Sequence, residues 1–210
     1  MDKPSGGLNQ RIFAWALSRF SARYEQFAAK YKERLFAGLS GTALEIGPGT
    51  GVNLRYFRRD VVRWIGVKPN FFMERYLREE AARLGMAVDL RAGTADHLPA
   101  DDGSVDAVIS TLVLCCVPDQ RKSLREIMRA LKTGGHFVFI EHVAAAPGSR
   151  LRRIQNLLTP VWRRLGDGCH PNRETGTELE RAGFAQISYE KVTAPVPVVS
   201  PQIVGVATKG

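Results

Sequence analysis

The stretch Leu44-Glu45-Ile46-Gly47-Pro48-Gly49-Thr50-Gly51, residues 44–51, decides the fold of this chain. It ends a short apolar run and carries three glycines at alternate positions. Glycine lets the backbone take left-handed conformations and come close to a ligand. An ordinary strand-to-helix turn needs one glycine, so this spacing predicts a ligand-binding loop. A dinucleotide-binding loop would also have a glycine at position 52, where this chain has Val52.

Apolar runs of strand length alternate with helix-like segments after residue 40. This alternation is typical of a parallel sheet with helices on both faces, and ligands bind such sheets at the carboxyl ends of the strands. Two final apolar segments are expected to pair antiparallel at one edge. The sequence therefore predicts an α/β fold with a seven-stranded, mostly parallel sheet. The expected strands are residues 43–46, 61–67, 87–90, 105–111, 136–140, 185–192 and 202–208, and the main expected helices are residues 8–37, 70–84, 118–131 and 151–165.

Length and composition describe a single globular domain, because the 210 residues are 44% hydrophobic and 24% charged. The three cysteines cannot form a disulfide framework, and we find neither a signal-peptide pattern nor an apolar stretch long enough to span a membrane. We therefore expect a cytoplasmic protein. The net charge of +9 is concentrated in residues 55–63 and 150–164 and is compatible with anionic substrates, nucleic acid or a membrane surface.

The pattern Glu45-x-Gly47-x-Gly49-x-Gly51 resembles motif I of the class I S-adenosylmethionine-dependent methyltransferases. Residues 93–96, 102–106 and 131–135 are similar to the corresponding segments of the methyltransferases of ubiquinone biosynthesis. A narrower resemblance, to the methyltransferase-like thiol S-methyltransferases, is carried by residues 111–115, 141–145, 167–169 and 173–174. The resemblance implies a Rossmann-like fold, S-adenosylmethionine as cofactor and methyl transfer to a small lipophilic acceptor, with a thiol sulfur favoured. It also implies a methyltransferase domain over residues 41–210, preceded by an amphipathic cap helix within residues 1–40.

The cofactor has three parts, and the resemblance assigns residues to each. Glu45 is expected to accept from the ammonium group, and the amides of Gly47, Gly49 and Gly51, with a helix N-terminus at Asn53, suit the carboxylate. The turn from Gly93 through Thr94 and Ala95 to Asp96 is placed to contact the adenine. Thr111 and Leu112, which end the expected strand 105–111, would line the methionine part.

Lys68-Pro69-Asn70 departs from the family pattern, which has an acidic residue there to accept both ribose hydroxyls. Lys68 has no acceptor atom. We therefore expect weaker cofactor binding, by roughly 1–3 kcal/mol. An alternative is a methyltransferase fold with repurposed cofactor use, acting as a cyclase, an isomerase or a binding protein. The positive charge suggests a second alternative, an RNA methyltransferase, but Ser110-Thr111-Leu112-Val113 lacks the Asn/Asp-Pro-Pro-aromatic motif of amino-methylating enzymes.

The acceptor side offers one candidate catalytic residue, His142, which can take a proton or merely shape the pocket. Asp167, Cys169 and His170 lack the spacing of a metal site, so no metal is expected. Residues 150–164 alternate arginines with apolar residues, a pattern that suits either an anionic membrane surface or a helix packed on the core. The residues expected to contact the substrate are Trp15, Tyr24, Tyr31, Cys115, Asp167 and His170.

Overall fold

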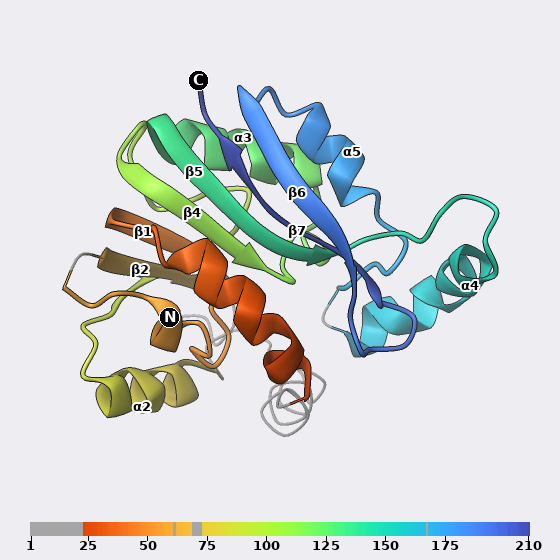
Figure 1. The fold of residues 1–210 in the computed structure, drawn as a ribbon, viewed down its shortest axis with the longest axis horizontal. Coiled ribbons are helices and arrows are strands. Elements are labelled where there is room, and N and C mark those ends of the chain that lie inside the picture. The colour runs from red at the N-terminus through yellow and green to blue at the C-terminus, as the bar shows by residue number, and fades with distance from the viewer. Residues whose placement is uncertain (1–22, 61, 69–72, 167) are drawn as a thin grey trace, which may run out of the picture.

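The protein is described by a computed structural model, which covers residues 23–60, 62–68, 73–166 and 168–210. Its strands form a seven-stranded sheet in the order β3-β2-β1-β4-β5-β7-β6 (Figure 1). The first five strands are parallel, and β7 runs antiparallel to both β5 and β6. The predicted fold class is therefore confirmed. The strands are β1 (Gly41–Ile46), β2 (Val62–Lys68), β3 (Asp89–Ala92), β4 (Val105–Thr111), β5 (Leu131–His142), β6 (Gln186–Thr193) and β7 (Pro201–Thr208).

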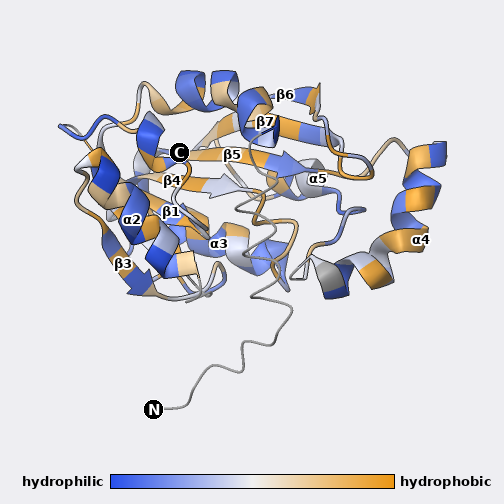
Figure 2. Ribbon diagram, turned by 90° about the horizontal axis from the view of Figure 1, so that it is seen from below, coloured by the Kyte–Doolittle hydropathy of each residue, from blue (hydrophilic) through white to orange (hydrophobic). Residues whose placement is uncertain are grey.

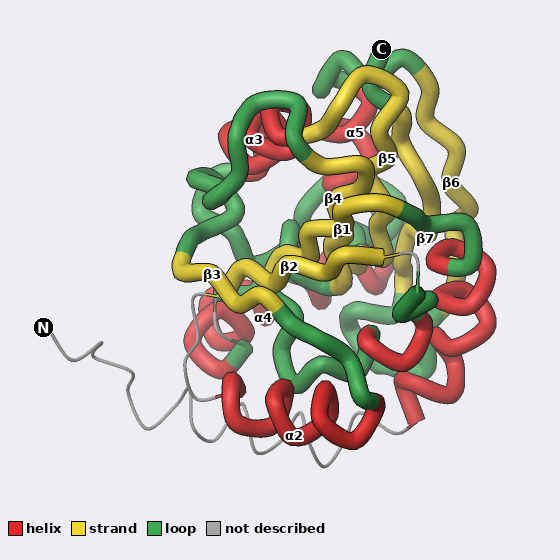
Figure 3. The backbone as a smooth tube through the Cα atoms, turned by 90° about the vertical axis from the view of Figure 1, so that its left-hand side faces the viewer, coloured by secondary structure: helices red, strands yellow, loops and turns green. Residues whose placement is uncertain are grey.

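Helices cover both faces of the sheet (Figures 1 and 3). On one face, Leu124 and Ile127 of α3 pack with Leu179 of α5 in a buried cluster. On the other face, Phe36 of the N-terminal helix packs in a second cluster with Leu77 of α2. Burying a side chain of this size contributes about 1.5–3 kcal/mol, so both layers stabilise the sheet. The helices are residues 23–36, η1 (Leu54–Tyr56), α2 (Glu74–Leu84), α3 (Gln120–Ala130), α4 (Arg150–Leu165) and α5 (Thr175–Glu180).

Strand boundaries differ from the prediction by one or two residues in most strands, and β5 and β3 differ most clearly. The strand expected to begin at residue 136 begins at Leu131, because that residue is extended and fully buried and the register between β4 and β5 shifts there. Gly135 lies inside this irregular part, where a Cβ would come within 2.8 Å of the Lys132 carbonyl oxygen. The strand expected at 87–90 is β3, at Asp89–Ala92, because the chain first turns at Gly85 and buries Met86 after α2.

Helix α4 projects from the body of the molecule (Figures 1 and 2). Its apolar residues Ile154, Leu157 and Val161 are 43%, 78% and 58% exposed. The other apolar residues of the expected stripe, Leu151, Leu158 and Trp162, are half-buried, and Gln155 is buried, so the helix packs on the body through part of its surface and exposes the rest. Among the described helices, none combines the length and hydropathy needed to cross a bilayer.

Candidate active site

The glycine loop lies at the carboxyl end of β1 with left-handed backbone at Gly47 (φ 60°), Gly49 (φ 56°) and Gly51 (φ 81°). A Cβ at Gly47 would lie 2.9 Å from Val113 Cγ2, so this glycine allows the loop to approach the segment after β4. At Gly49 the nearest atom to a Cβ would be Met73 Sδ, at 3.7 Å, and no other atom of the described residues lies within 4 Å. Gly49 is therefore the position where a ligand has room to approach the loop.

Two of the three glycine amides in the loop, which were expected to bind a carboxylate, donate hydrogen bonds within the protein instead. The Gly47 amide donates to the Val67 carbonyl oxygen at 2.9 Å, and the Gly51 amide donates to the Pro48 carbonyl oxygen at 2.9 Å. These two donors are used within the protein, so the expected contact of loop amides with a carboxylate is not available to them. The helix expected at Asn53 is also reduced to the single turn η1, and a helix terminus contributes little there.

In place of these amides, the side chain of Asn53 offers a polar contact to a ligand at the end of β1. Its Nδ2 donates to Glu45 Oε1 at 2.7 Å and to Thr111 Oγ1 at 3.1 Å. A carboxylate only accepts hydrogen bonds, so the amide orientation is fixed by its chemistry. Asn53 Oδ1 is buried and has no hydrogen-bond partner among the described residues. An unsatisfied buried acceptor costs about 1–3 kcal/mol, which a ligand N–H donor would recover.

Glu45 hydrogen-bonds to Asn53 and Trp64, so it acts on a ligand through Asn53. Both carboxylate oxygens already accept a hydrogen bond, Oε1 from Asn53 and Oε2 from Trp64 Nε1 at 3.0 Å. Burial raises the pKa of Glu45 to about 7, although the hydrogen bonds from Asn53 and Trp64 oppose that rise. The buried carboxylate thus orients Asn53 and leaves Asn53 Oδ1 as the free acceptor at the end of β1.

The end of β4 meets the glycine loop through a strained turn. Leu112 has a positive φ of 57°, which a non-glycine residue adopts at a cost of about 1–3 kcal/mol. Its amide donates to the Ile140 carbonyl oxygen of β5 at 2.8 Å, and this bond holds the turn. Thr111 and Leu112 therefore lie on the same edge of the sheet as Asn53, where the sequence predicts the methionine part of the cofactor.

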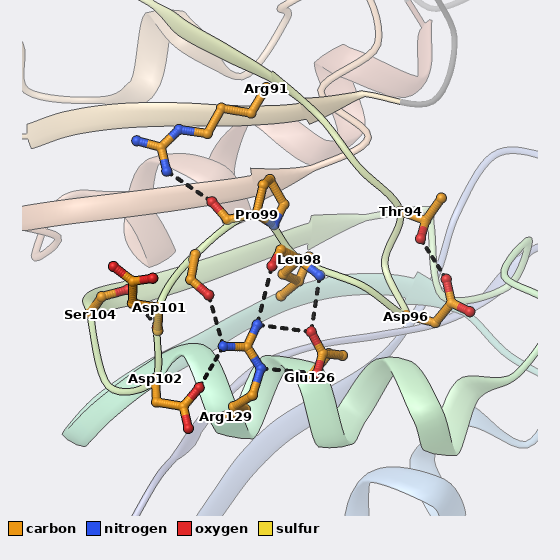
Figure 4. Close-up of polar contacts among 11 residues, drawn as sticks. Arg91, Thr94, Asp96, Leu98, Pro99, Asp101, Asp102, Ser104, Glu126 and Arg129 are labelled. Atoms are coloured by element: carbon orange, nitrogen blue, oxygen red, sulfur yellow. Dashed lines mark hydrogen bonds and ion pairs between the residues drawn. The ribbon is translucent and has the colours of Figure 1, made fainter.

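The turn after β3, which the sequence places at the adenine, contributes the carboxylate of Asp96. Thr94 Oγ1 donates to Asp96 Oδ1 at 2.6 Å (Figure 4). Lys122 Nζ contacts Asp96 Oδ2 at 3.1 Å. The hydrogen bond from Thr94 and the Lys122 ammonium lower the pKa of Asp96. Gly93 serves packing, because a Cβ there would lie 2.8 Å from Pro99 Cδ, and Ala95 is buried in the core.

A guanidinium network ties this turn to α3 (Figure 4). Arg129 donates to the carbonyl oxygens of Leu98 and Ala100 and pairs with Glu126 and Asp102. A cavity of about 400 Å³ lies beside this network. The two arginines that line this cavity, Arg91 and Arg129, are already paired with protein acceptors, so we assign the network a structural role.

Four chemically reactive side chains converge at the carboxyl ends of β4 and β5. Cys115 Sγ and Cys116 Sγ are 3.5 Å apart, and both lie within 4.8 Å of Cys169 Sγ. His142 Nε2 lies 2.9 Å from Cys169 Sγ, and His142 Nδ1 is buried with no partner among the described residues. We call these four residues the thiol cluster. The sequence selected His142 and Cys115 as site residues, but not Cys116 and Cys169, because their proximity to the site depends on the fold.

The remaining predicted substrate residues fall in different places. Tyr24 donates to Gln202 Oε1 at 3.0 Å, and burial raises its pKa, with the charges of Glu141 and Glu25 adding to that rise. Tyr31 instead packs in a hydrophobic cluster with Ile140 and Val204, which is a core role. The His170 amide donates to the Cys115 carbonyl oxygen at 2.9 Å, which fixes it beside the thiol cluster. Trp15, Pro69, Asn70 and Asp167 lie outside the described residues, as does the side chain of Lys68.

Comparisons with known proteins agree with this geometry. Residues 44–139 match the family described as a methyltransferase domain. The chain is 40% identical to thiol S-methyltransferase TMT1A of Homo sapiens, over 95% of this chain and 87% of the relative. Among solved structures, the [4+2]-cyclase SpnF has a TM-score of 0.71 at 20% identity, covering 90% of this chain and 83% of that one. A SAM-dependent methyltransferase of Thermotoga maritima, described as a possible histamine N-methyltransferase, has a TM-score of 0.68 at 22% identity, covering 96% and 99%.

The two solved structures establish the fold, and the identity to the human relative along nearly the whole chain establishes the family. The predicted resemblance is confirmed. The chain belongs to the thiol S-methyltransferase family, within the S-adenosylmethionine-dependent methyltransferases.

Proposed function

We propose that the chain transfers the methyl group of S-adenosylmethionine to the thiol sulfur of a small lipophilic acceptor. The observation that carries this proposal is the 40% identity to a thiol S-methyltransferase over 95% of the chain. The thiol cluster supports it, because the cluster brings an imidazole to the edge of the sheet where the glycine loop ends. Parallel α/β sheets bind their ligands at this edge.

The residues at the end of β1 fit the amino-acid part of the cofactor. Asn53 Oδ1 is a buried acceptor without a partner among the described residues, and an ammonium group supplies the donor that it lacks. The open space beside Gly49 leaves room for the chain of the methionine part. When bound, the cofactor supplies an activated methyl group to the acceptor sulfur. Leu112, held by its bond to Ile140, would line the same space.

For the adenosine part of the cofactor, we propose different contacts at the adenine and at the ribose. Asp96 and Thr94 offer carboxylate and hydroxyl acceptors to an amino group. At the ribose, Lys68 stands where the family has an acidic residue, so we propose that affinity there is lower by roughly 1–3 kcal/mol. Cofactor binding would then depend more on Asn53 and the glycine loop than in relatives with the acidic residue.

His142 is proposed as the residue that removes the proton of the acceptor thiol. A thiol with a pKa near 8.5 is mostly protonated at neutral pH, and the thiolate is the nucleophile. A base within hydrogen-bond reach raises the reactive fraction, an effect commonly worth about 10²–10⁴-fold in rate. His142 Nδ1 is suited to this role because it is buried and unpaired among the described residues.

An acceptor panel tests the proposal. We expect the purified chain to methylate simple alkyl thiols, and we expect His142→Ala to lower kcat for them while the Kd for S-adenosylmethionine is unchanged. The matched control is His136→Ala, in the middle of β5, where the side chain is exposed and bonds to Thr208. Turnover of amine, phenol or carbon acceptors with every thiol inert would contradict the thiol assignment.

Helix α4 supports a proposal about where the enzyme acts. Ile154, Leu157 and Val161 form an exposed apolar stripe, and exposed arginines flank it at residues 150, 153, 163 and 164. An amphipathic helix with basic flanks binds anionic lipid through buried apolar area and charge attraction. We propose peripheral contact with an anionic membrane surface, which would give the enzyme access to lipophilic thiols. The proposed compartment is the cytoplasm, whose reducing conditions suit the three free cysteines.

Vesicle cosedimentation measures this contact. The chain is expected to sediment with phosphatidylserine-containing vesicles and to be released by high salt, because salt screens the arginines. Leu157→Ser with Val161→Ser should weaken the binding, whereas Tyr76→Ser, which removes an exposed apolar residue on α2, should leave it unchanged. Equal sedimentation with neutral and anionic vesicles would contradict the proposal.

A further inference from the structure

The thiol cluster is arranged for proton sharing more than for metal binding. In a tetrahedral zinc site with Zn–S of 2.3 Å and Zn–N of about 2.0 Å, a nitrogen and a sulfur ligand lie about 3.5 Å apart. His142 Nε2 and Cys169 Sγ are 2.9 Å apart, which is the distance of a direct hydrogen bond. Both side chains are buried, with His142 3% and Cys169 8% exposed.

The surroundings place a negative charge on Cys169 in preference to the other two sulfurs. The nearby thiols of Cys115 and Cys116, whose sulfurs lie within 4.8 Å of Cys169 Sγ, and the contact with His142 lower the pKa of Cys169. Burial raises the pKa of Cys115 well above its usual value, and that thiol keeps its proton and donates it to the Leu112 carbonyl oxygen at 3.4 Å. The guanidinium of Arg173 is near enough to interact electrostatically with all three sulfurs. The titratable and charged groups around the cluster are Tyr24, Cys115, Cys116, Glu141, His142, His170 and Arg173.

We propose that Cys169 is a thiolate that accepts the Nε2 hydrogen of His142 and thereby leaves Nδ1 as the proton acceptor for the substrate. Cys169 is in this account a positioning residue that holds the imidazole in one tautomer and one orientation, as a buried carboxylate does in a catalytic triad. The role assigned to Nδ1 rests on the proposed function, whereas the charge on Cys169 is a property of the free enzyme.

The proton transfer follows from this arrangement. The S–H bond of the acceptor thiol breaks, its electron pair stays on sulfur, and the proton forms an N–H bond at His142 Nδ1. The imidazolium that results is hydrogen-bonded to the Cys169 thiolate, so the pair becomes neutral overall. Burial raises the pKa of the nearby Glu141, while hydrogen bonds to its Oε1 from Ser110 and from the amides of Val113 and Leu114 favour its ionised form. The positive charge therefore develops where fixed negative charge already exists.

The ionisation of Cys169 can be measured without turnover. The chain has three cysteines, so Cys115→Ser with Cys116→Ser leaves Cys169 as the sole thiol and retains hydroxyl donors in the place of the two thiols. We expect thiolate absorbance at 240 nm to persist at pH 6, where an ordinary cysteine is ionised to about 1% or less. Adding His142→Ala should raise the pH at which this absorbance appears, and adding His136→Ala should not. Titration of Cys169 at or above the pH of an ordinary cysteine would overturn the proposal.

If the double serine variant does not fold, the wild-type chain supplies the same quantity. The rate at which iodoacetamide alkylates Cys169, resolved by peptide mass spectrometry, is expected to stay constant from pH 6 to pH 8, because the thiolate fraction does not change. A rate that rises tenfold per pH unit would contradict the thiolate. One equivalent of zinc in the purified protein would also contradict it, because the metal would then occupy the sulfurs.

Turnover separates this inference from the proposed function. Cys169→Ser keeps an acceptor for Nε2 but not its charge, so kcat for thiols should fall about tenfold or more while the KM for the cofactor is retained, and the variant's pH–rate profile should shift relative to the wild type. Wild-type kcat and an unshifted profile in Cys169→Ser would overturn the positioning role. A thiolate in an enzyme that methylates no thiol would refute the proposed function alone, and thiol methylation without a Cys169 thiolate would refute this inference alone.

Discussion

Replacing Glu45 by glutamine is predicted to stabilise the protein above neutral pH while it weakens cofactor binding. Burial raises the pKa of Glu45 to about 7 in the folded chain, against a usual value of 4.5. Between these two pH values the folded state binds more protons than the unfolded state, so the free energy of unfolding falls as pH rises from 4.5 to 7. The full difference of about 2.5 pH units corresponds to roughly 3 kcal/mol above pH 7.

Glutamine removes this ionisation but not without a local cost. Glutamine has one acceptor oxygen for two donors, Asn53 Nδ2 and Trp64 Nε1, so one of the two hydrogen bonds, worth about 1 kcal/mol, is lost and the contact with Asn53 is altered. The net expectation for Glu45→Gln is a gain of about 2 kcal/mol at pH 8 and a loss of about 1 kcal/mol at pH 4.5, where the wild-type carboxyl is already neutral. The altered contact with Asn53 should weaken S-adenosylmethionine binding at pH 8, because Asn53 Oδ1 would no longer be held in place.

Urea unfolding at several pH values, followed by circular dichroism, measures this prediction. Glu80→Gln is the matched control, because the hydrogen bond from Arg83 lowers the pKa of that half-buried carboxyl and its removal should not stabilise the protein at pH 8. If the wild-type and Glu45→Gln curves of unfolding free energy against pH run parallel, the buried carboxylate does not titrate as the structure requires, and the reasoning about Asn53 fails with it.

Two other changes test the cofactor site. Lys68→Glu should supply the ribose acceptor that the chain lacks and tighten S-adenosylmethionine binding by up to about a hundredfold, measured by calorimetry, and unchanged or weaker affinity would refute the ribose argument. Gly49→Val should abolish binding because the branched side chain fills the open space beside Met73, while far-ultraviolet circular dichroism shows that the sheet persists; retained binding would show that the cofactor lies elsewhere.

The fold was predictable from sequence because its signals are local. Strand-length apolar runs, intervening helices and the glycine loop of residues 44–51 are all read within a few residues, and they yield the observed sheet. Boundaries were less accurate where packing outweighs local preference. Leu131 begins β5 because it is buried against the core, although the pair Gly134-Gly135 suggested a break between helix and strand there.

The site was predictable where one segment supplies its residues and not where distant segments meet. The motif Glu45 to Gly51 marks the loop. That Glu45 orients Asn53 and does not bind the ligand itself depends on Trp64, which donates to Glu45 from β2. The thiol cluster is the clearer case. Cys169 follows α4 and joins His142 of β5 only after the whole sheet has formed, so no spacing in the sequence shows their contact.

The central claim is that this chain delivers the methyl group of S-adenosylmethionine to a thiol sulfur, and product analysis tests it most directly. The purified chain is incubated with S-adenosylmethionine carrying a ¹³C methyl group and an equimolar mixture of an alkyl thiol, a phenol and a primary amine, and the products are identified by nuclear magnetic resonance and mass spectrometry. The account predicts a ¹³C-labelled methyl thioether formed in equal amount with S-adenosylhomocysteine. A labelled methyl ether or methylamine with no thioether would contradict it.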